Sequence, residues 1–177
     1  MFHGFIERLK IAAQSDAIVN PYHKNECPFV IACGSERGTT LVFAKALQDF
    51  LLGVGLKCYL VEMNQFENFK SMDHLIVLTS TYGVGGAPFN ALQFNKKFKA
   101  ASLKKKFKYT VVGFGSEKYP TFCQYAENVN FLLNAMDISE EWISLVKIND
   151  QSLEQFKSWF DVLYSKLEGQ LTMAFKD

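Results

Sequence analysis

Short, almost wholly apolar runs alternate along the chain with longer stretches in which apolar residues recur every three or four positions. The short runs are rich in Val and Ile, which is typical of β-strands covered on both faces. They span residues 29–33, 56–63, 74–80, 109–115 and 142–148. The longer stretches have helical spacing and span residues 40–55, 88–101, 121–136 and 152–171. This alternation predicts an α/β fold with a parallel sheet and helices on both of its faces.

The residues before the first predicted strand follow a different pattern. Four apolar side chains share one face of a short predicted amphipathic helix: Phe2, Phe5, Ile6 and Leu9. We expect this helix to pack on the domain or to be the remnant of a longer chain, because it carries too little positive charge for a membrane-surface helix. The expected organisation is an N-terminal extension, one domain and a C-terminal tail, over residues 1–28, 29–168 and 169–177.

Composition is that of a folded protein, since 49% of the residues are apolar and 21% are charged. No apolar run approaches the roughly 20 residues that a membrane-spanning helix needs. The N-terminus is too polar for a secretory signal peptide. The four cysteines are widely separated and form no metal-ligand pattern. We therefore expect reduced thiols, no metal site and a cytoplasmic location.

The connection after the first predicted strand, Gly-Ser-Glu-Arg-Gly-Thr-Thr at residues 34–40, has the composition of an anion-binding loop. Its glycines allow the backbone to curl so that N–H groups converge, and its hydroxyls add further donors. The helix that follows presents the positive end of its dipole to the same place. The loop lacks the Gly-x-x-x-x-Gly-Lys and Gly-x-Gly-x-x-Gly patterns. It therefore predicts a site for one monoester phosphate, or else an ordinary strand–helix turn.

Two further connections combine glycines with aromatic residues. Residues 80–91 contain Tyr82 and three glycines, and residues 113–129 contain Tyr119 and Phe122. In a parallel sheet all three connections leave the same edge, which is where ligands bind. Aromatic side chains in surface loops need a partner to cover them. Two aromatic loops beside a phosphate loop predict a flat ring with a phosphate tail, and we expect flavin mononucleotide (FMN) as the cofactor.

These three loops, in this order, resemble those of the flavodoxin family, in particular the FMN domains of diflavin reductases and small stand-alone flavodoxins. The reductases concerned are of the cytochrome reductase, sulfite reductase flavoprotein and nitric oxide synthase types. The resemblance covers residues 28–168, and it implies a flavodoxin-like, doubly wound sheet of five parallel strands in the order 2-1-3-4-5. It implies that FMN is bound by Ser35, Glu36, Arg37, Gly38, Thr39, Thr40, Thr81, Tyr82, Gly83, Gly85, Phe114, Gly115, Tyr119, Phe122 and Cys123.

The chain departs from the family pattern at several charged positions. Arg37 stands where the family has a hydroxyl, and it either pairs with the phosphate or points to solvent. Glu36 would be unfavourable beside a dianion unless it points away. Acidic residues that help to dock a basic partner in the family are absent at Val84, Gly86 and Ser116. These differences put a typical acidic docking face in doubt, but not the binding of FMN.

Charge is unevenly distributed although the formal net charge is +1. Residues 96–108 hold seven lysines and no acid, and the rest of the chain carries 12 basic and 18 acidic residues. By topology this run lies at the amino ends of the strands, opposite the predicted flavin edge. It is either a solvated helix end or a contact for anionic lipid or an acidic partner. The lysines are Lys96, Lys97, Lys99, Lys104, Lys105, Lys106 and Lys108.

Two functions fit these observations. The first is an electron carrier that shuttles single electrons from an FAD/NADPH-type flavoprotein reductase to a haem or iron–sulfur protein. We expect no catalytic residue, because FMN carries the chemistry, and no nucleic-acid partner. The chain would then be a stand-alone carrier or the FMN module of a larger NADPH-dependent reductase, which leaves open whether it is itself an enzyme. The alternative is a flavin-free interaction module of the same fold, although the retained tyrosines and glycines favour the carrier.

Overall fold

The apolar runs form the five parallel strands of one sheet in the computed structural model, which describes the backbone of residues 1–174 and the side chains of residues 1–169. The strands are β1 (Phe29–Gly34), β2 (Cys58–Glu62), β3 (His74–Ser80), β4 (Phe107–Gly115) and β5 (Ser139–Asn149). Their order across the sheet is β2-β1-β3-β4-β5, which confirms the predicted order. Every neighbouring pair is parallel, so all the carboxyl ends lie at one edge.

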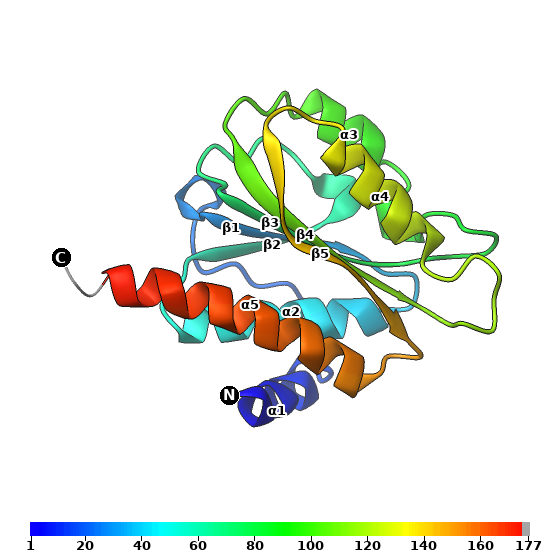
Figure 1. Cartoon of the computed structure of the whole chain (residues 1–177), viewed down its shortest axis with the longest axis horizontal. Helices are drawn as coiled ribbons and strands as arrows, with labels where there is room; N and C mark the ends of the chain where they lie inside the picture. The colour runs from blue at the N-terminus through cyan, green and yellow to red at the C-terminus, as the bar shows by residue number, and fades with distance from the viewer. Residues whose placement is uncertain (175–177) are drawn as a thin grey trace.

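Helices cover both faces of the sheet, as Figure 1 shows. The helices are α1 (Phe2–Ala12), α2 (Thr39–Gly53), α3 (Phe94–Ala100), α4 (Gln124–Asn134) and α5 (Leu153–Ala174). Single 3₁₀ turns are η1 (Lys24–Glu26), η2 (Met63–Gln65) and η3 (Phe89–Ala91). One face carries α2 and α5, with α1 outside them, and the other carries α3 and α4. Within the described residues no helix has the length and apolar character to cross a membrane.

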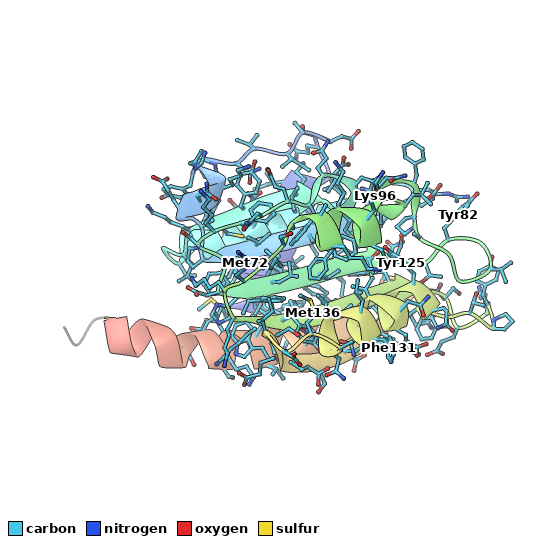
Figure 2. The ribbon with its side chains drawn as sticks, turned by 90° about the horizontal axis from the view of Figure 1, so that it is seen from above. Met72, Tyr82, Lys96, Tyr125, Phe131 and Met136 are labelled. Atoms are coloured by element: carbon cyan, nitrogen blue, oxygen red, sulfur yellow. The ribbon has the colours of Figure 1, made fainter. Side chains whose placement is uncertain are left out.

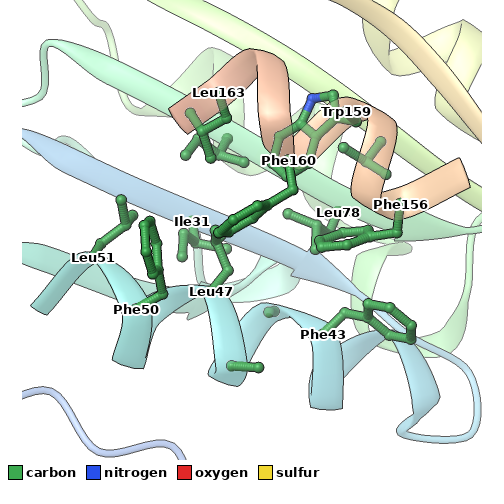
Figure 3. Packing of buried hydrophobic residues seen from close by; sticks show 14 of the residues in the cluster. Ile31, Phe43, Leu47, Phe50, Leu51, Leu78, Phe156, Trp159, Phe160 and Leu163 are labelled. Atoms are coloured by element: carbon green, nitrogen blue, oxygen red, sulfur yellow. The ribbon is translucent and has the colours of Figure 1, made fainter. Parts of the chain in front are cut away.

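Phenylalanine side chains fill the layer between the sheet and the α2–α5 pair (Figure 3). Phe43 of α2 contacts Phe156 of α5 with ring centroids 4.9 Å apart, and Phe50 contacts Phe160 at 4.8 Å. Burial of each such side chain stabilises the fold by about 1.5–3 kcal/mol. The core therefore locks α2, whose N-terminus adjoins the predicted phosphate loop, against the sheet.

The predicted helix over residues 88–101 is interrupted in the structure. Its first part is the 3₁₀ turn η3, and α3 begins only at Phe94. The side chain of Asn64 causes the break, because its Nδ2 donates to Phe89 O (3.0 Å) and its Oδ1 accepts the Gln93 N–H (2.6 Å). Backbone groups that a continuous helix would have paired internally are thus bound by a side chain from another segment.

The N-terminal extension packs closely against the domain. Phe5 of α1 is fully buried, with its ring 5.1 Å from that of Phe156 and 5.0 Å from that of Phe160. Further along, Asn20 Nδ2 donates to Leu60 O (2.9 Å), and Asn20 Oδ1 accepts the Leu60 N–H (2.8 Å). The side-chain amide therefore pairs with the outer edge of β2 as another strand would, which protects that edge from further pairing.

The last helix extends beyond the predicted helical stretch of residues 152–171 and so takes up much of the expected tail, residues 169–177. α5 continues to Ala174 through residues that are mostly good helix formers, and the one glycine, Gly169, does not end it. The remainder of the expected tail, residues 175–177, lies outside the described residues.

Candidate functional site

A cavity of about 460 Å³ lies at the carboxyl edge of the sheet, where the connections after β1, β3, β4 and β5 converge. This volume is within the range of about 300–1,000 Å³ that is usual for small-molecule sites. Most of the residues expected to bind FMN line it: Ser35, Glu36, Arg37, Thr39, Thr40, Thr81, Tyr82, Gly83, Phe114, Gly115, Tyr119, Phe122 and Cys123. The structure thus brings together residues from all three loops that the sequence singled out.

The loop between β1 and α2 offers several hydrogen-bond donors to this cavity. Gly38 precedes α2 with a φ of +83°, a left-handed conformation that favours glycine. The N–H groups of the first helical turn have no carbonyl partner within the helix, and the turn closes with Val42 N–H donating to Gly38 O (3.2 Å). Ser35, Thr39 and Thr40 add hydroxyls to the cavity wall. The donors and the helix dipole together favour the binding of an anion here. Gly38 itself shapes the turn and does not line the cavity wall.

The two charged residues of this loop are held differently. Glu36 Oε2 accepts the backbone N–H of Phe89 at 2.7 Å, so its carboxylate is bound by the second loop. Arg37 is exposed at the rim and forms no ion pair with the carboxylates of the described residues. The Arg37 guanidinium can therefore pair with a phosphate in the loop, whereas the Glu36 carboxylate is already hydrogen-bonded to Phe89 N–H.

Tyr82 lies in a tight backbone hairpin of the second loop. Its N–H donates to Gly86 O (2.9 Å), and the Gly86 N–H donates to Tyr82 O (2.8 Å). Gly83 and Gly85 occupy this hairpin with φ of +55° and +82°, values that favour glycine. Tyr82 is 54% exposed, and Figure 2 shows it at the end of the molecule away from Met72. Gly85 does not line the cavity: a Cβ there would come within 3.1 Å of Gln124 Cγ, so its role is in the turn.

The third loop supplies a second exposed tyrosine and a neutral thiol. Tyr119 is 65% exposed, and Cys123 is fully buried at the start of α4 with a φ of +55°. Burial raises the pKa of the Cys123 thiol to about 11, so the thiol is protonated at neutral pH and packs as an uncharged group. A Cβ on Gly115 would lie 3.2 Å from the ring of Phe122, which explains the glycine at this close approach.

Several lining residues were missed from the sequence: Ser80, Ser116, Thr121, Asp150 and Gln151. Ser80 and Ser116 directly adjoin predicted residues and could have been included on that ground. Asp150 and Gln151 belong to the connection after β5, whose only sequence signal is an Asn-Asp pair at the strand end. Both adopt a positive φ, and the Asp150 N–H donates to Gly115 O (2.8 Å), which ties this connection to the third loop.

The cavity has the chemistry that FMN requires. Ser80 Oγ and Ser116 Oγ are buried in its wall without a hydrogen-bond partner among the described residues. Such a buried, unsatisfied hydroxyl costs about 1–3 kcal/mol, and rotation of either side chain toward the cavity would let a ligand with polar ring atoms remove that cost. The exposed rings of Tyr82 and Tyr119 suit a flat aromatic group, and the loop before α2 suits a phosphate.

The flavodoxin family model matches residues 31–159, and the chain belongs to the flavodoxin family. Inducible nitric oxide synthase of Oncorhynchus mykiss is 28% identical over 178 residues, covering 93% of this chain and 37% of the synthase. The sulfite reductase [NADPH] flavoprotein alpha-component of Photobacterium profundum is 28% identical over 110 residues, covering 60% of this chain and 18% of that protein. The chain therefore spans well under half the length of these relatives.

Solved flavodoxins share the fold. A flavodoxin of Streptococcus pneumonia superposes with a TM-score of 0.64 at 25% identity, covering 77% of this chain and 97% of that one. The C101A mutant of flavodoxin from Pseudomonas aeruginosa gives a TM-score of 0.62 at 19% identity, covering 81% and 98%. The chain is a flavodoxin-like, FMN-binding electron-transfer domain similar to the FMN domains of diflavin reductases.

Proposed function

We propose that the phosphate of FMN binds to the loop between β1 and α2. The hydroxyls of Ser35, Thr39 and Thr40 and the N–H groups of the first turn of α2 would hold it. Arg37 would supply the positive charge, since no carboxylate of the described residues already pairs with its guanidinium. This arrangement suits one phosphate group rather than a longer polyphosphate.

The flavin ring would lie between Tyr82 and Tyr119, with the remaining wall around it. That wall comprises Thr81, Gly83, Phe114, Gly115, Phe122 and Cys123. When bound, FMN supplies the redox chemistry of the site by accepting and releasing electrons. The protein side chains hold the ring and exclude water. The Cys123 thiol stays uncharged at neutral pH, because burial raises its pKa to about 11.

The partners are inferred from the relatives and from the surface around the cavity. Nitric oxide synthase and a sulfite reductase flavoprotein combine such a domain with other parts of a much longer chain. We infer that this domain takes electrons from an FAD/NADPH-type flavoprotein reductase and passes them to a haem or iron–sulfur acceptor. Tyr82, Val84 and Phe89 are 54%, 95% and 73% exposed beside the cavity, where a partner would have to approach.

Two smaller proposals concern the cellular location of the protein and a partner for its lysine run. All four cysteines are buried and free, which agrees with the reducing conditions of the cytoplasm. The lysine run of residues 96–108 lies on α3, on the start of β4 and between them. Only its later part, residues 104–108, lies at the amino edge of the sheet as expected, whereas Lys96 in the first turn of α3 lies nearer to the Tyr82 end in Figure 2, because α3 starts close to the carboxyl edge. A contact with anionic lipid or an acidic partner there would leave the flavin edge free for electron transfer.

One observation carries the proposal: donor loop, exposed tyrosines and unpartnered hydroxyls converge in one cavity. The test is the visible spectrum of the purified protein, followed by titration with FMN. We expect flavin absorption bands and saturable quenching of FMN fluorescence at micromolar concentrations, which corresponds to about −8 kcal/mol. A colourless protein that leaves the fluorescence of micromolar FMN unchanged would instead be the flavin-free interaction module.

A further inference from the structure

A reciprocal pair of hydrogen bonds joins the first and second loops of the cavity. Ser35 N–H donates to Asn90 Oδ1 at 2.6 Å, and Phe89 N–H donates to Glu36 Oε2 at 2.7 Å. Each loop thus contributes one backbone donor and one side-chain acceptor to the other. These four residues are called the loop clasp below.

The loop clasp fixes the segment that carries Tyr82. Phe89 and Asn90 belong to η3, and only Ala87 and Pro88 separate η3 from the closed hairpin between Tyr82 and Gly86. Because the hairpin is closed by its own backbone bonds and Pro88 restricts the connection, the position of η3 sets the position of the hairpin. The clasp therefore links the phosphate loop to the tyrosine that would cover the flavin ring.

Charge and position make opposite predictions for Glu36. A carboxylate beside a dianionic phosphate is repelled by it, so charge alone predicts that removing Glu36 strengthens FMN binding. The hydrogen bond to Phe89 predicts the reverse, because the carboxylate holds the second loop in place. We propose that Glu36 is a positioning residue that orders the Tyr82 hairpin and so favours flavin binding despite its charge. The inference rests on the proposed FMN function and adds a residue role to it.

Two substitutions separate these effects. E36A removes both the charge and the acceptor, whereas E36Q removes the charge and keeps an amide oxygen that can accept the Phe89 N–H. FMN and riboflavin, which lacks the phosphate, serve as ligands in fluorescence titrations. We expect E36A to weaken the binding of both flavins by about five- to tenfold, as the loss of a partly exposed charged hydrogen bond predicts. E36Q should restore both affinities to within about twofold of the wild type.

Glu117 provides the matched control, since it is an exposed carboxylate in the third loop outside the clasp. E117A should leave riboflavin binding unchanged. Amide hydrogen exchange of Phe89 in the flavin-free protein gives a readout independent of flavin. We expect E36A to accelerate that exchange by about tenfold and E36Q to restore its protection.

Three results would overturn the role of Glu36. They are stronger FMN binding by E36A, a loss confined to FMN with riboflavin unaffected, or unchanged exchange at Phe89. Wild-type protein that binds neither flavin would overturn the proposed function and, with it, a role of Glu36 in flavin binding. The exchange measurement would still show, in that case, whether the loop clasp orders η3.

Discussion

Two hollows of nearly equal volume lie at opposite ends of the sheet, and they differ in the side chains that line them. The cavity at the carboxyl edge measures about 460 Å³ and contains two buried hydroxyls without partners. The hollow at the amino edge measures about 450 Å³ and is lined by residues of both charges, among them Asp73, Lys106 and Lys108. Volume therefore does not distinguish a binding site from a surface groove in this protein.

Backbone conformation and exposed side chains separate the two ends as well. Around the carboxyl-edge cavity Cys123, Asp150 and Gln151 adopt a positive φ, which costs free energy in residues other than glycine, whereas on the amino side only Ser102 does so among the described residues. Residues 75–95, which include the second loop, contain no charged side chain and expose Tyr82 to solvent. Backbone strain and exposed aromatic side chains are thus concentrated where a ligand would offset their cost. The amino edge shows instead charged side chains that water can screen, of which Lys105 and Asp73 form an ion pair.

The largest effect expected at the carboxyl edge comes from the two tyrosines. Each ring stacked on a flavin contributes about 0.5–1.5 kcal/mol beyond its buried area, so Y82A and Y119A combined should weaken FMN binding about a hundredfold. Fluorescence titration measures the affinity. F131A is the control, because Phe131 is 76% exposed on α4 and does not line the cavity. Equal losses in the double variant and in F131A would remove the distinction between this cavity and the rest of the surface.

The arrangement of the elements follows from local patterns, whereas the details of the site depend on distant contacts. Apolar runs specify strands, and parallel strands bring the three loops to one edge whatever the side chains beyond them do. The direction of Glu36 could not be predicted, because it is set by the N–H of Phe89, which lies 53 residues further along the chain. The break before α3 likewise depends on Asn64, a side chain outside the predicted helix.

The connection after β5 was overlooked for a related reason. Its residues are neither glycine nor aromatic, and the Asn-Asp pair at the end of β5 is too weak a signal to predict a ligand site. Asp150 and Gln151 reach the cavity because the Asp150 N–H donates to Gly115 O, a contact between the ends of neighbouring strands. Such a role appears only once the register of β4 and β5 is known.

The principal effect expected at the amino edge is on stability, through His74. Its imidazole lies between Phe29 and Trp142, with ring centroids 4.6 and 4.5 Å away. Burial lowers the pKa of His74 from 6.5 to about 4. Nearby Asp73 opposes this shift and Lys108 adds to it. Between these pH values the unfolded chain binds more protons than the folded one, so stability is greatest above pH 6.5 and falls as the pH approaches 4. The loss should be about 2 kcal/mol, allowing for partial solvent screening.

Urea unfolding at several pH values tests this expectation. H74F keeps an aromatic ring between Phe29 and Trp142 but cannot take up a proton, so its stability should change less over this pH range. H3Q removes an exposed imidazole and is the matched control. If H74F and the wild type lose stability in parallel between pH 6.5 and 4, the acid sensitivity arises from other groups.

A smaller effect on binding is expected from Arg37. Its guanidinium should pair with the flavin phosphate, so R37A should weaken FMN binding about tenfold at low salt and leave riboflavin unaffected. The difference should shrink as salt screens the exposed pair. K118A removes an exposed cation from the third loop and should have little effect. An equal loss for riboflavin would show that R37A disturbs the loop rather than the phosphate contact.

The smallest effect is expected from the lysines of the amino edge, although they carry most of the local charge. Lys105 pairs with Asp73 at 2.6 Å, but the two side chains are 51% and 48% exposed. K105A should therefore cost no more than about 1 kcal/mol of unfolding free energy, because water and salt already screen such a pair. FMN affinity should not change, since Lys105 and the cavity lie at opposite ends of parallel strands. A K105A variant with impaired FMN binding would show that the two ends are coupled, and the contrast between them would no longer hold.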